Sequence, residues 1–398
     1  MTSKRPSQPE CDELLALCRS LLRTRSYSGE EGDAARELLS YFYGNGTGTV
    51  TVDRFGNVIC TIQGSRPGPR LLFDGHMDTV PVTDDTQWTY PPFAAEVHNG
   101  RLYGRGATDM KCALAAMSCA AVSFAKRTGG DFPGSLHIAG TVHEECFEGV
   151  AARSVSSIVQ PDYVVIGEAT GLNLNIGQRG RAEIKLSVFG KPAHSASPEK
   201  GINAVYGMAE IIQRLRALTP PRHEVLGPGI LELTDIRSAP YPGASVVPEY
   251  CEATYDRRLL TGETKESVFA PIQALLEDLH QHNPQLDAHV SYARGEERCY
   301  TGEMISGERF FPGWLFDSGE DFVRRAKHGL DEAGIRPVLS QYNFCTNGSH
   351  YAGESGIRTL GFGPSVESLA HTVNEYAELD EVYAAMEGYI AIMRALLE

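Results

Sequence analysis

Apolar residues recur at helical spacing in several parts of the chain and form short unbroken runs in others. The helical spacing predicts helices at residues 11–25, 30–43, 110–126, 318–334 and 379–397. The short runs are bounded by turn residues and predict strands at 49–52, 58–62, 71–74, 136–143, 163–167 and 357–362. Buried strands that alternate with helices are typical of α/β proteins, so we expect an α/β fold.

The pattern changes between residues 180 and 294. There the expected elements follow the order strand, helix, strand, strand, helix, strand, at 182–189, 202–218, 230–236, 249–258, 264–280 and 288–292. This is the order of the ferredoxin-like split unit. A chain of 398 residues has room for two domains. We therefore predict one domain formed by residues 1–179 and 295–398, with residues 180–294 inserted as a second domain.

Composition and charge narrow the choice of partners. The formal net charge of −15 offers nothing that would attract nucleic acid or an anionic membrane. The nine cysteines include no C-x-x-C pair, which argues against a disulfide framework or a thiolate zinc site and favours a reducing compartment. Residues 1–10 do not resemble a signal peptide, and no apolar run approaches the length of a membrane span. We expect a cytoplasmic protein.

Three of the expected strands run into residue types that commonly bind metals. The strand at 71–74 leads to His76, the strand at 136–143 leads to Glu144 and Glu145, and the strand at 163–167 leads to Glu168. In open α/β sheets, ligands bind outside the carboxyl ends of the strands. Each residue alone is also typical of an ordinary polar turn, but three such exits at one sheet edge predict a shared site.

Two further positions fit such a site. In His76-Met77-Asp78, one imidazole nitrogen can face a metal while Asp78 accepts the hydrogen on the other nitrogen and fixes the tautomer. Asp109 stands where a glycine-containing loop meets a helix, a place equally typical of a helix N-cap. That loop satisfies neither phosphate-binding glycine motif, so we reject a nucleotide site there.

The adjacent pair Glu144-Glu145 predicts two different roles. Consecutive side chains of an extended chain point in opposite directions, so one glutamate can bind a metal while its neighbour faces a bound water. Imidazoles and carboxylates without thiolates suit zinc, and also cobalt or manganese. With the late His371, the set is too large for one catalytic zinc and suits two metals that share a carboxylate and a water.

These motifs carry a family resemblance. D-G-H-M-D-T-V-P at 74–81, G-R-G-A-T-D-M-K at 104–111, the Glu144-Glu145 pair, the strand exit at Glu168 and the late His371 resemble the dinuclear zinc amidohydrolases and peptidases. That family includes acetylornithine deacetylase, succinyl-diaminopimelate desuccinylase, aminoacylase and the glutamate carboxypeptidases. The resemblance extends over nearly the whole chain. It implies a zinc-peptidase-like catalytic domain, with a mixed sheet flanked by helices, and an inserted ferredoxin-like domain that serves as lid and dimerisation surface.

A closer similarity is to the subgroup of hydrolases linked to selenium metabolism, whose substrates are poorly defined. It is carried by Y-D-R-R-L at 255–259, T-N-G at 346–348 and G-F-G-P at 361–364. Acetylornithine deacetylases carry other residues at the T-N-G turn, so the similarity does not imply their substrate.

The resemblance implies two metal ions, zinc in the first instance. The implied ligands are His76, Asp109, Glu145, Glu168 and His371. Asp109 would bridge the two ions, and the peptide bond from Asp109 to Met110 would be cis. His76 and Glu168 would complete one ion, and Glu145 and His371 would complete the other.

The same resemblance implies the groups that carry the reaction. Glu144 would be the general base that takes a proton from the water between the metals and passes it to the leaving amine. Asp78 would orient His76. His194, in the inserted domain, would stabilise the oxyanion of the intermediate from the partner subunit of a homodimer.

Substrate contacts are implied at four positions: Asn203, Arg258, Asn347 and Gly348. An arginine fork suits a substrate carboxylate, which is the group that Asn203 and Arg258 would hold. We therefore expect hydrolysis of a C–N amide bond in a small N-acyl or N-carbamoyl amino acid or dipeptide.

Two other readings stay open. A co-catalytic zinc aminopeptidase or dipeptidase would need a pocket for a free α-amine, and an acidic residue near Asn347, with no basic group near His194, would favour it. A non-enzymatic amino-acid-binding protein on the same fold would have lost Glu144 or a ligand, and this chain retains all of them.

Overall fold

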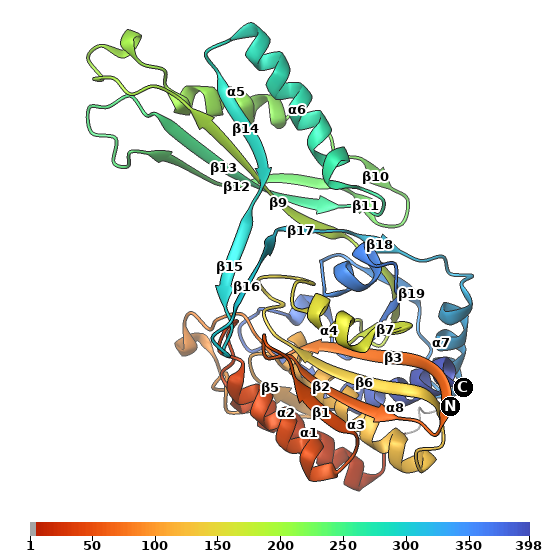
Figure 1. The fold of residues 1–398 in the computed structure, drawn as a ribbon. Coiled ribbons are helices and arrows are strands. Elements are labelled where there is room, and N and C mark those ends of the chain that lie inside the picture. The colour runs from red at the N-terminus through yellow and green to blue at the C-terminus, as the bar shows by residue number, and fades with distance from the viewer. Residues whose placement is uncertain (1–4) are drawn as a thin grey trace. The chain divides into compact units, whose positions relative to one another are not determined.

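The computed structural model describes residues 5–398 and divides the chain into two compact units (Figure 1). Unit 1 contains the chain up to Gln178, Glu296–Gly307 and Leu315–Glu398, and unit 2 contains Arg179–Gly295 and Glu308–Trp314. Unit 2 thus differs from the expected insertion at 180–294 by a second, short passage of the chain. That passage carries β17 (Phe310–Phe311), which pairs with β9 (Gly180–Phe189). An apolar run of this length cannot be told from a turn in the sequence.

Unit 1 is built on a sheet whose strands follow the order β1-β2-β6-β3-β7-β20-β8-β18, with β19 beside β8. The strands are β1 (Thr49–Val52), β2 (Val58–Gln63), β3 (Arg66–His76), β6 (Pro133–Thr141), β7 (Tyr163–Ile166), β8 (Leu174–Gln178), β18 (Trp314–Leu315), β19 (Leu339–Tyr342) and β20 (Arg358–Gly361). The neighbours β6, β3, β7 and β20 are parallel, whereas β2 pairs with β6 and β20 pairs with β8 in antiparallel orientation. The expected mixed sheet is therefore confirmed.

Helices cover both faces of this sheet. Successive side chains of a strand point to opposite faces, and in the central strands the side chains on both faces are apolar. In β3, Leu72 belongs to a core cluster with residues of α4 (Ala152–Val159). The next residue, Phe73, packs edge-on against Tyr389 of α8 (Leu379–Leu397), with the ring centroids 5.6 Å apart. A strand buried on both faces reads as a continuous apolar run, which is the pattern that predicted this strand.

The other helices of unit 1 are α1 (Gln8–Arg23), α2 (Gly32–Asn45), α3 (Cys112–Thr128) and α7 (Asp321–Glu332). α3 is buried on all sides over most of its length and packs against α1 and α8. Its many alanines allow this close approach. A small sheet with the order β21-β5-β4 joins β21 (Tyr376–Glu378), β5 (Arg101–Tyr103) and β4 (Glu96–His98).

Unit 2 has an antiparallel sheet with the order β12-β13-β9-β14, formed with β12 (Ile230–Ala239), β13 (Tyr250–Leu259) and β14 (Asp287–Tyr292). The helices α5 (Ala204–Leu215) and α6 (Lys265–His282) follow β9 and β13 in the chain. The element order β9-α5-β12-β13-α6-β14 is that of the ferredoxin-like unit. Its core includes Ile184, Met208, Ala253 and Ile272. A hairpin of β15 (Arg294–Arg298) and β16 (Met304–Glu308) follows β14, and β10 (Arg222–His223) pairs with β11 (Gly227–Pro228).

No disulfide joins the nine cysteines, which all lie within residues 5–398, and eight of them are buried. Among residues 5–398, no helix is both long enough and apolar enough to cross a membrane.

Candidate metal centre

The carboxyl ends of three neighbouring parallel strands carry the candidate metal ligands. His76 is the last residue of β3 and pairs in register with Thr141, the last residue of β6. Glu144 and Glu145 follow β6 after a short turn, and Glu168 follows β7. Because β6, β3 and β7 are adjacent and parallel, their exits meet at one edge of the sheet.

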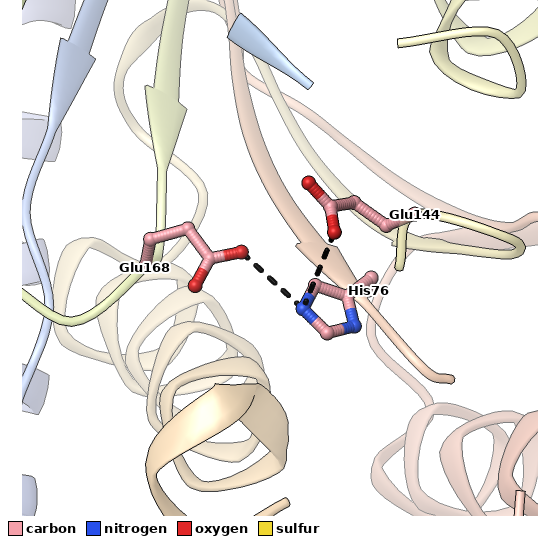
Figure 2. Close-up of side chains that lie close together, drawn as sticks. All are labelled: His76, Glu144 and Glu168. Atoms are coloured by element: carbon pink, nitrogen blue, oxygen red, sulfur yellow. Dashed lines mark ion pairs between the residues drawn. The ribbon is translucent and has the colours of Figure 1, made fainter. Parts of the chain in front are cut away.

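The first half of the cluster surrounds the imidazole of His76 (Figure 2). Its Nε2 lies 3.3 Å from Oε1 of Glu168 and 3.9 Å from Oε2 of Glu144. The same nitrogen lies 2.8 Å from Oδ1 of Asp109. The side chain of His76 is 1% exposed, so these charged groups meet out of contact with bulk water.

The second half of the cluster brings together residues from three loops. Nε2 of His371 lies 3.2 Å from Oδ2 of Asp109 and 3.1 Å from Oε2 of Glu145. Asp109 therefore presents one carboxylate oxygen to His76 and the other to His371. A carboxylate between two imidazoles is well placed to bridge two metal ions. The peptide bond from Asp109 to Met110 is cis, as the resemblance implied.

The donor set fits divalent metals. His76 forms one group with Glu144 and Glu168 and another with Asp109 and Glu145, and in each group the ligand atoms lie close enough to hold an ion. Within residues 5–398, Oε1 of Glu145 is a buried oxygen without a hydrogen-bond partner. A buried polar atom normally has a partner, and a cation would supply one here. Imidazoles and carboxylates without a thiolate are ligands that suit zinc.

The charges of the cluster act strongly on one another. Burial, together with the charge of Asp109, raises the pKa of Glu145 and of Glu168 to about 7. Burial also raises the pKa of Glu144 well above its usual range. Hydrogen bonds with Asp109 and Glu145 raise the pKa of His371 to about 10. So many buried carboxylates attract cations, and a divalent metal competes with protons for the same atoms.

Asp78 holds the backbone of the Glu144-Glu145 turn. Its Oδ1 accepts from the N–H of Glu144 and its Oδ2 from the N–H of Glu145, both at 3.1 Å, and Oδ2 also accepts from the Ser28 hydroxyl at 2.7 Å. The acceptor nearest to Nδ1 of His76 is the backbone carbonyl of Asp78, at 2.9 Å, with the carboxylate 3.5 Å away. We expected the carboxylate to orient His76. The carbonyl has the closer contact because the carboxylate is engaged by backbone N–H groups.

Two of the expected substrate contacts, Asn347 and Gly348, lie inside unit 1, and their role toward a substrate stays a prediction. The Asn347 amide donates to Oδ1 of Asp74 at 2.8 Å and to the Thr141 hydroxyl at 3.0 Å, and its oxygen accepts from the N–H of Gly149 at 2.8 Å. Asn347 is 2% exposed, and the N–H of Gly348 is bonded within its own turn. Through these contacts, the turn of Asn347 connects β3, β6 and the loop after β6.

Replacing Asn347 by alanine is expected to lower the free energy of unfolding by about 1–3 kcal/mol, because buried groups on Asp74 and Gly149 lose their partner. Chemical denaturation of the variant and the parent measures the difference. Asn343→Ala is the matched control, since the amide of Asn343 is exposed and its hydrogen bond to Glu367 is long, at 3.4 Å. Unchanged stability with weakened substrate binding would contradict the structural role.

The remaining three residues expected at the site lie in unit 2. His194 is exposed in the turn after β9, and its Nδ1 accepts from a backbone N–H two residues further on, at 3.0 Å. Asn203 caps α5, since its Oδ1 accepts from N–H groups of the first turn. Arg258 on β13 pairs with Asp256 at 2.8 Å and keeps 31% of its side chain exposed. The roles of these residues stay predictions.

Two buried carboxylates support the cluster and were not singled out from the sequence. Asp74 stands in the D-G-H motif and accepts from the Tyr351 hydroxyl at 2.9 Å. Glu375 follows His371 and accepts from the backbone N–H of Asp109 at 3.1 Å. In the sequence, such a supporting role is indicated only by an acidic residue close to a ligand histidine. That signal is weak, because acidic residues near a ligand are common in polar loops.

Comparison with known proteins agrees with this geometry. The model of peptidase family M20/M25/M40 matches residues 72–395. The uncharacterized protein YgeY of Escherichia coli strain K12 is 30% identical over 386 residues, which cover 96% of this chain and 93% of that protein. Succinyl-diaminopimelate desuccinylase 2 of Ruegeria sp. strain TM1040 is 29% identical over 393 residues, which cover 95% of this chain and 93% of the relative.

Among solved structures, the YXEP protein of Bacillus subtilis, described as a dinuclear metal-binding peptidase of the M20 family, superposes with a TM-score of 0.74. The match covers 98% of this chain and 100% of that one at 13% identity, and so speaks for the fold alone. The family match spans most of the chain and includes every residue of the cluster. The chain therefore belongs to peptidase family M20/M25/M40 and is a metal-dependent hydrolase.

Proposed function

We propose that the protein hydrolyses a C–N amide bond in a small N-acyl or N-carbamoyl amino acid or dipeptide. The observation that carries the proposal is the placement of Asp109, whose two carboxylate oxygens face His76 and His371. This placement supports two ions: His76 and Glu168 would complete one, and Glu145 and His371 the other. Zinc fits the donor set best, with cobalt and manganese as alternatives.

The bound ions would supply Lewis acidity and lower the pKa of a water held between them. Glu144 is buried beside His76, its Oε2 3.9 Å from Nε2, which is close enough to serve a water at the cluster but too long for a hydrogen bond. As general base, Glu144 takes a proton from the attacking water and returns it to the leaving amine. Asp78 keeps the turn that carries Glu144 in place through its two N–H contacts.

The competing aminopeptidase reading needs a carboxylate free to bind an α-amine near Asn347. The acidic partner of Asn347 is Asp74, which is 1% exposed and bonded to both Asn347 and Tyr351. It offers no charge to a substrate, so we favour an acylated amino group. Family membership with a complete residue set leaves no support for a non-enzymatic binding protein.

For unit 2 we propose the roles of lid and dimerisation surface, with His194 donating to the substrate oxygen across the dimer. Asn203 and Arg258 would hold the substrate carboxylate, for which an arginine fork is suited. The exposed position of His194 supports a role outside its own unit's core. We also propose a cytoplasmic location, supported by the lack of disulfides among residues 5–398.

Mixing His194→Ala subunits with Glu144→Ala subunits is expected to restore activity toward half of that of the parent dimer. Each variant alone should be nearly inactive, because losing one oxyanion donor costs about a hundredfold to a thousandfold in kcat. In a mixed dimer, the intact cluster of one chain would meet the intact His194 of the other. Mass spectrometry verifies that mixed dimers form. Mixed dimers without recovery would mean that His194 does not act across the interface.

The proposed reaction is tested by assaying zinc-loaded enzyme against matched sets of N-acyl amino acids, N-carbamoyl amino acids and free-amine dipeptides. Glu144→Gln, purified in the same way, controls for contaminating hydrolases. Turnover of acylated or carbamoylated substrates by the parent alone supports the proposal. Turnover confined to peptides with a free α-amine would favour the aminopeptidase instead.

A further inference from the structure

We propose that Glu375 is a positioning residue that sets the affinity of one of the two metal positions, the one formed by Asp109, Glu145 and His371. The inference rests on the proposed metal assignment and adds a residue outside the ligand set. Glu375 is fully buried, and among residues 5–398 it belongs to neither group able to hold an ion.

The carboxylate of Glu375 is occupied on both oxygens. Oε1 accepts from the backbone N–H of Thr108 at 2.9 Å and from that of Asp109 at 3.1 Å. Oε2 lies 2.5 Å from Nη1 of Arg105, whose side chain is 6% exposed. A buried carboxylate held by a guanidinium and two N–H groups is fixed in direction. It therefore fixes the backbone from which the Asp109 side chain projects.

The same residue anchors the loop that carries His371. The backbone carbonyl of Glu375 accepts from the N–H of Gly104 at 3.0 Å, and the strand that follows, β21, pairs with β5. His371 itself has a half-exposed side chain and a left-handed backbone, with φ of 62°. Glu375 thus connects the loop of His371 to the segment of Asp109, although the two are far apart in the chain.

The other metal position has a different support. His76 belongs to β3, in the middle of the parallel strands, and Glu168 directly follows the neighbouring β7. Strand pairing holds these two residues without help from Glu375. Disturbing Glu375 should therefore weaken the position that includes His371 more than the position that includes Glu168.

Glu375→Gln tests this with nearly unchanged shape. A glutamine has one acceptor oxygen, so its NH₂ group must face either Arg105 or the N–H groups of Thr108 and Asp109, donor against donor. We expect the zinc dissociation constant of the position that includes His371 to rise about 10- to 100-fold, the usual cost of losing an outer contact of a metal site. The dissociation constant of the other position should change less than about threefold. Competition titrations with a zinc chelator on the full-length protein measure both constants.

Glu378→Gln is the matched control, because Glu378 lies three residues after Glu375, at the end of β21, and pairs with Arg101 at 2.7 Å, yet both side chains are more than one-third exposed. It should leave both constants unchanged. Thermal unfolding of the chelator-treated proteins distinguishes an effect on metal affinity from a purely structural effect. A purely structural effect would lower the unfolding temperature without changing one dissociation constant more than the other. If Glu375→Gln does not fold, Arg105→Lys, which keeps the charge and loosens the pairing, should show a smaller split in the same direction.

Equal weakening of both positions, weakening confined to the position that includes Glu168, or no change would overturn the inference. If the parent binds fewer than two ions, the metal assignment itself fails, and this outcome is distinct from a parent with two ions whose variant shows no split. Glu375→Asp, which keeps the charge, should lie between the parent and Glu375→Gln.

Discussion

Glu144→Gln is expected to keep both metal ions and to lower kcat by about a hundredfold to ten-thousandfold, which is the usual contribution of a general base. The amide has nearly the shape of the carboxylate but cannot take a proton from the attacking water. Steady-state kinetics on zinc-loaded protein, with metal content measured on the same sample, checks both parts. KM should change little, because the group acts on proton transfer.

Glu145→Gln is the companion variant, since Glu145 lies next in sequence and contacts His371 at 3.1 Å. It should release one ion while Glu144→Gln releases none. His76 also forms a group with Glu144 and Glu168 that could hold an ion. If Glu144→Gln loses an ion and Glu145→Gln does not, Glu144 is a ligand and the two roles are exchanged.

Asp109→Asn is expected to lose at least one of the two ions and to reduce turnover on the order of a thousandfold or more, since a metal contributes several kcal/mol to transition-state stabilisation. The asparagine amide has one oxygen and one NH₂ group, so its NH₂ hydrogens would face one of the two cations. The backbone contacts of residue 109 with Glu375 are retained, so the variant should fold.

Chelator-treated parent enzyme provides the control for Asp109→Asn. It should lose activity, and added zinc should restore it, whereas zinc should not restore the variant. Full metal content and normal turnover in Asp109→Asn would show that this carboxylate bridges nothing. Metal content measured by elemental analysis keeps the result independent of the substrate chosen.

The sequence predicted the parts of the site that depend on local pattern. The apolar runs before His76, Glu144 and Glu168 become β3, β6 and β7, and their parallel pairing follows from the α/β alternation. A strand buried on both faces is a continuous apolar run in the sequence, so the residue after the run is expected at the end of the strand. This is why the ligands could be grouped before any contact was known.

Contacts between distant segments could not be predicted in this way. Asp109 and Glu375 are 266 positions apart, and Asn347 and Asp74 are 273 apart. The T-N-G turn of Asn347 is typical of an exposed loop, yet the amide of Asn347 is buried and donates to Asp74 and Thr141. Short elements were missed for a different reason. β17 has only two residues, too few to show a period.

The central claim, two metal ions joined by Asp109, is tested most directly by anomalous X-ray diffraction at the zinc edge on crystals of the zinc-loaded protein. The account predicts two peaks about 3.5–4 Å apart, with Asp109 between them. One peak should lie beside His76 and Glu168, and the other beside Glu145 and His371. A single peak, or two peaks that do not share Asp109, would contradict it.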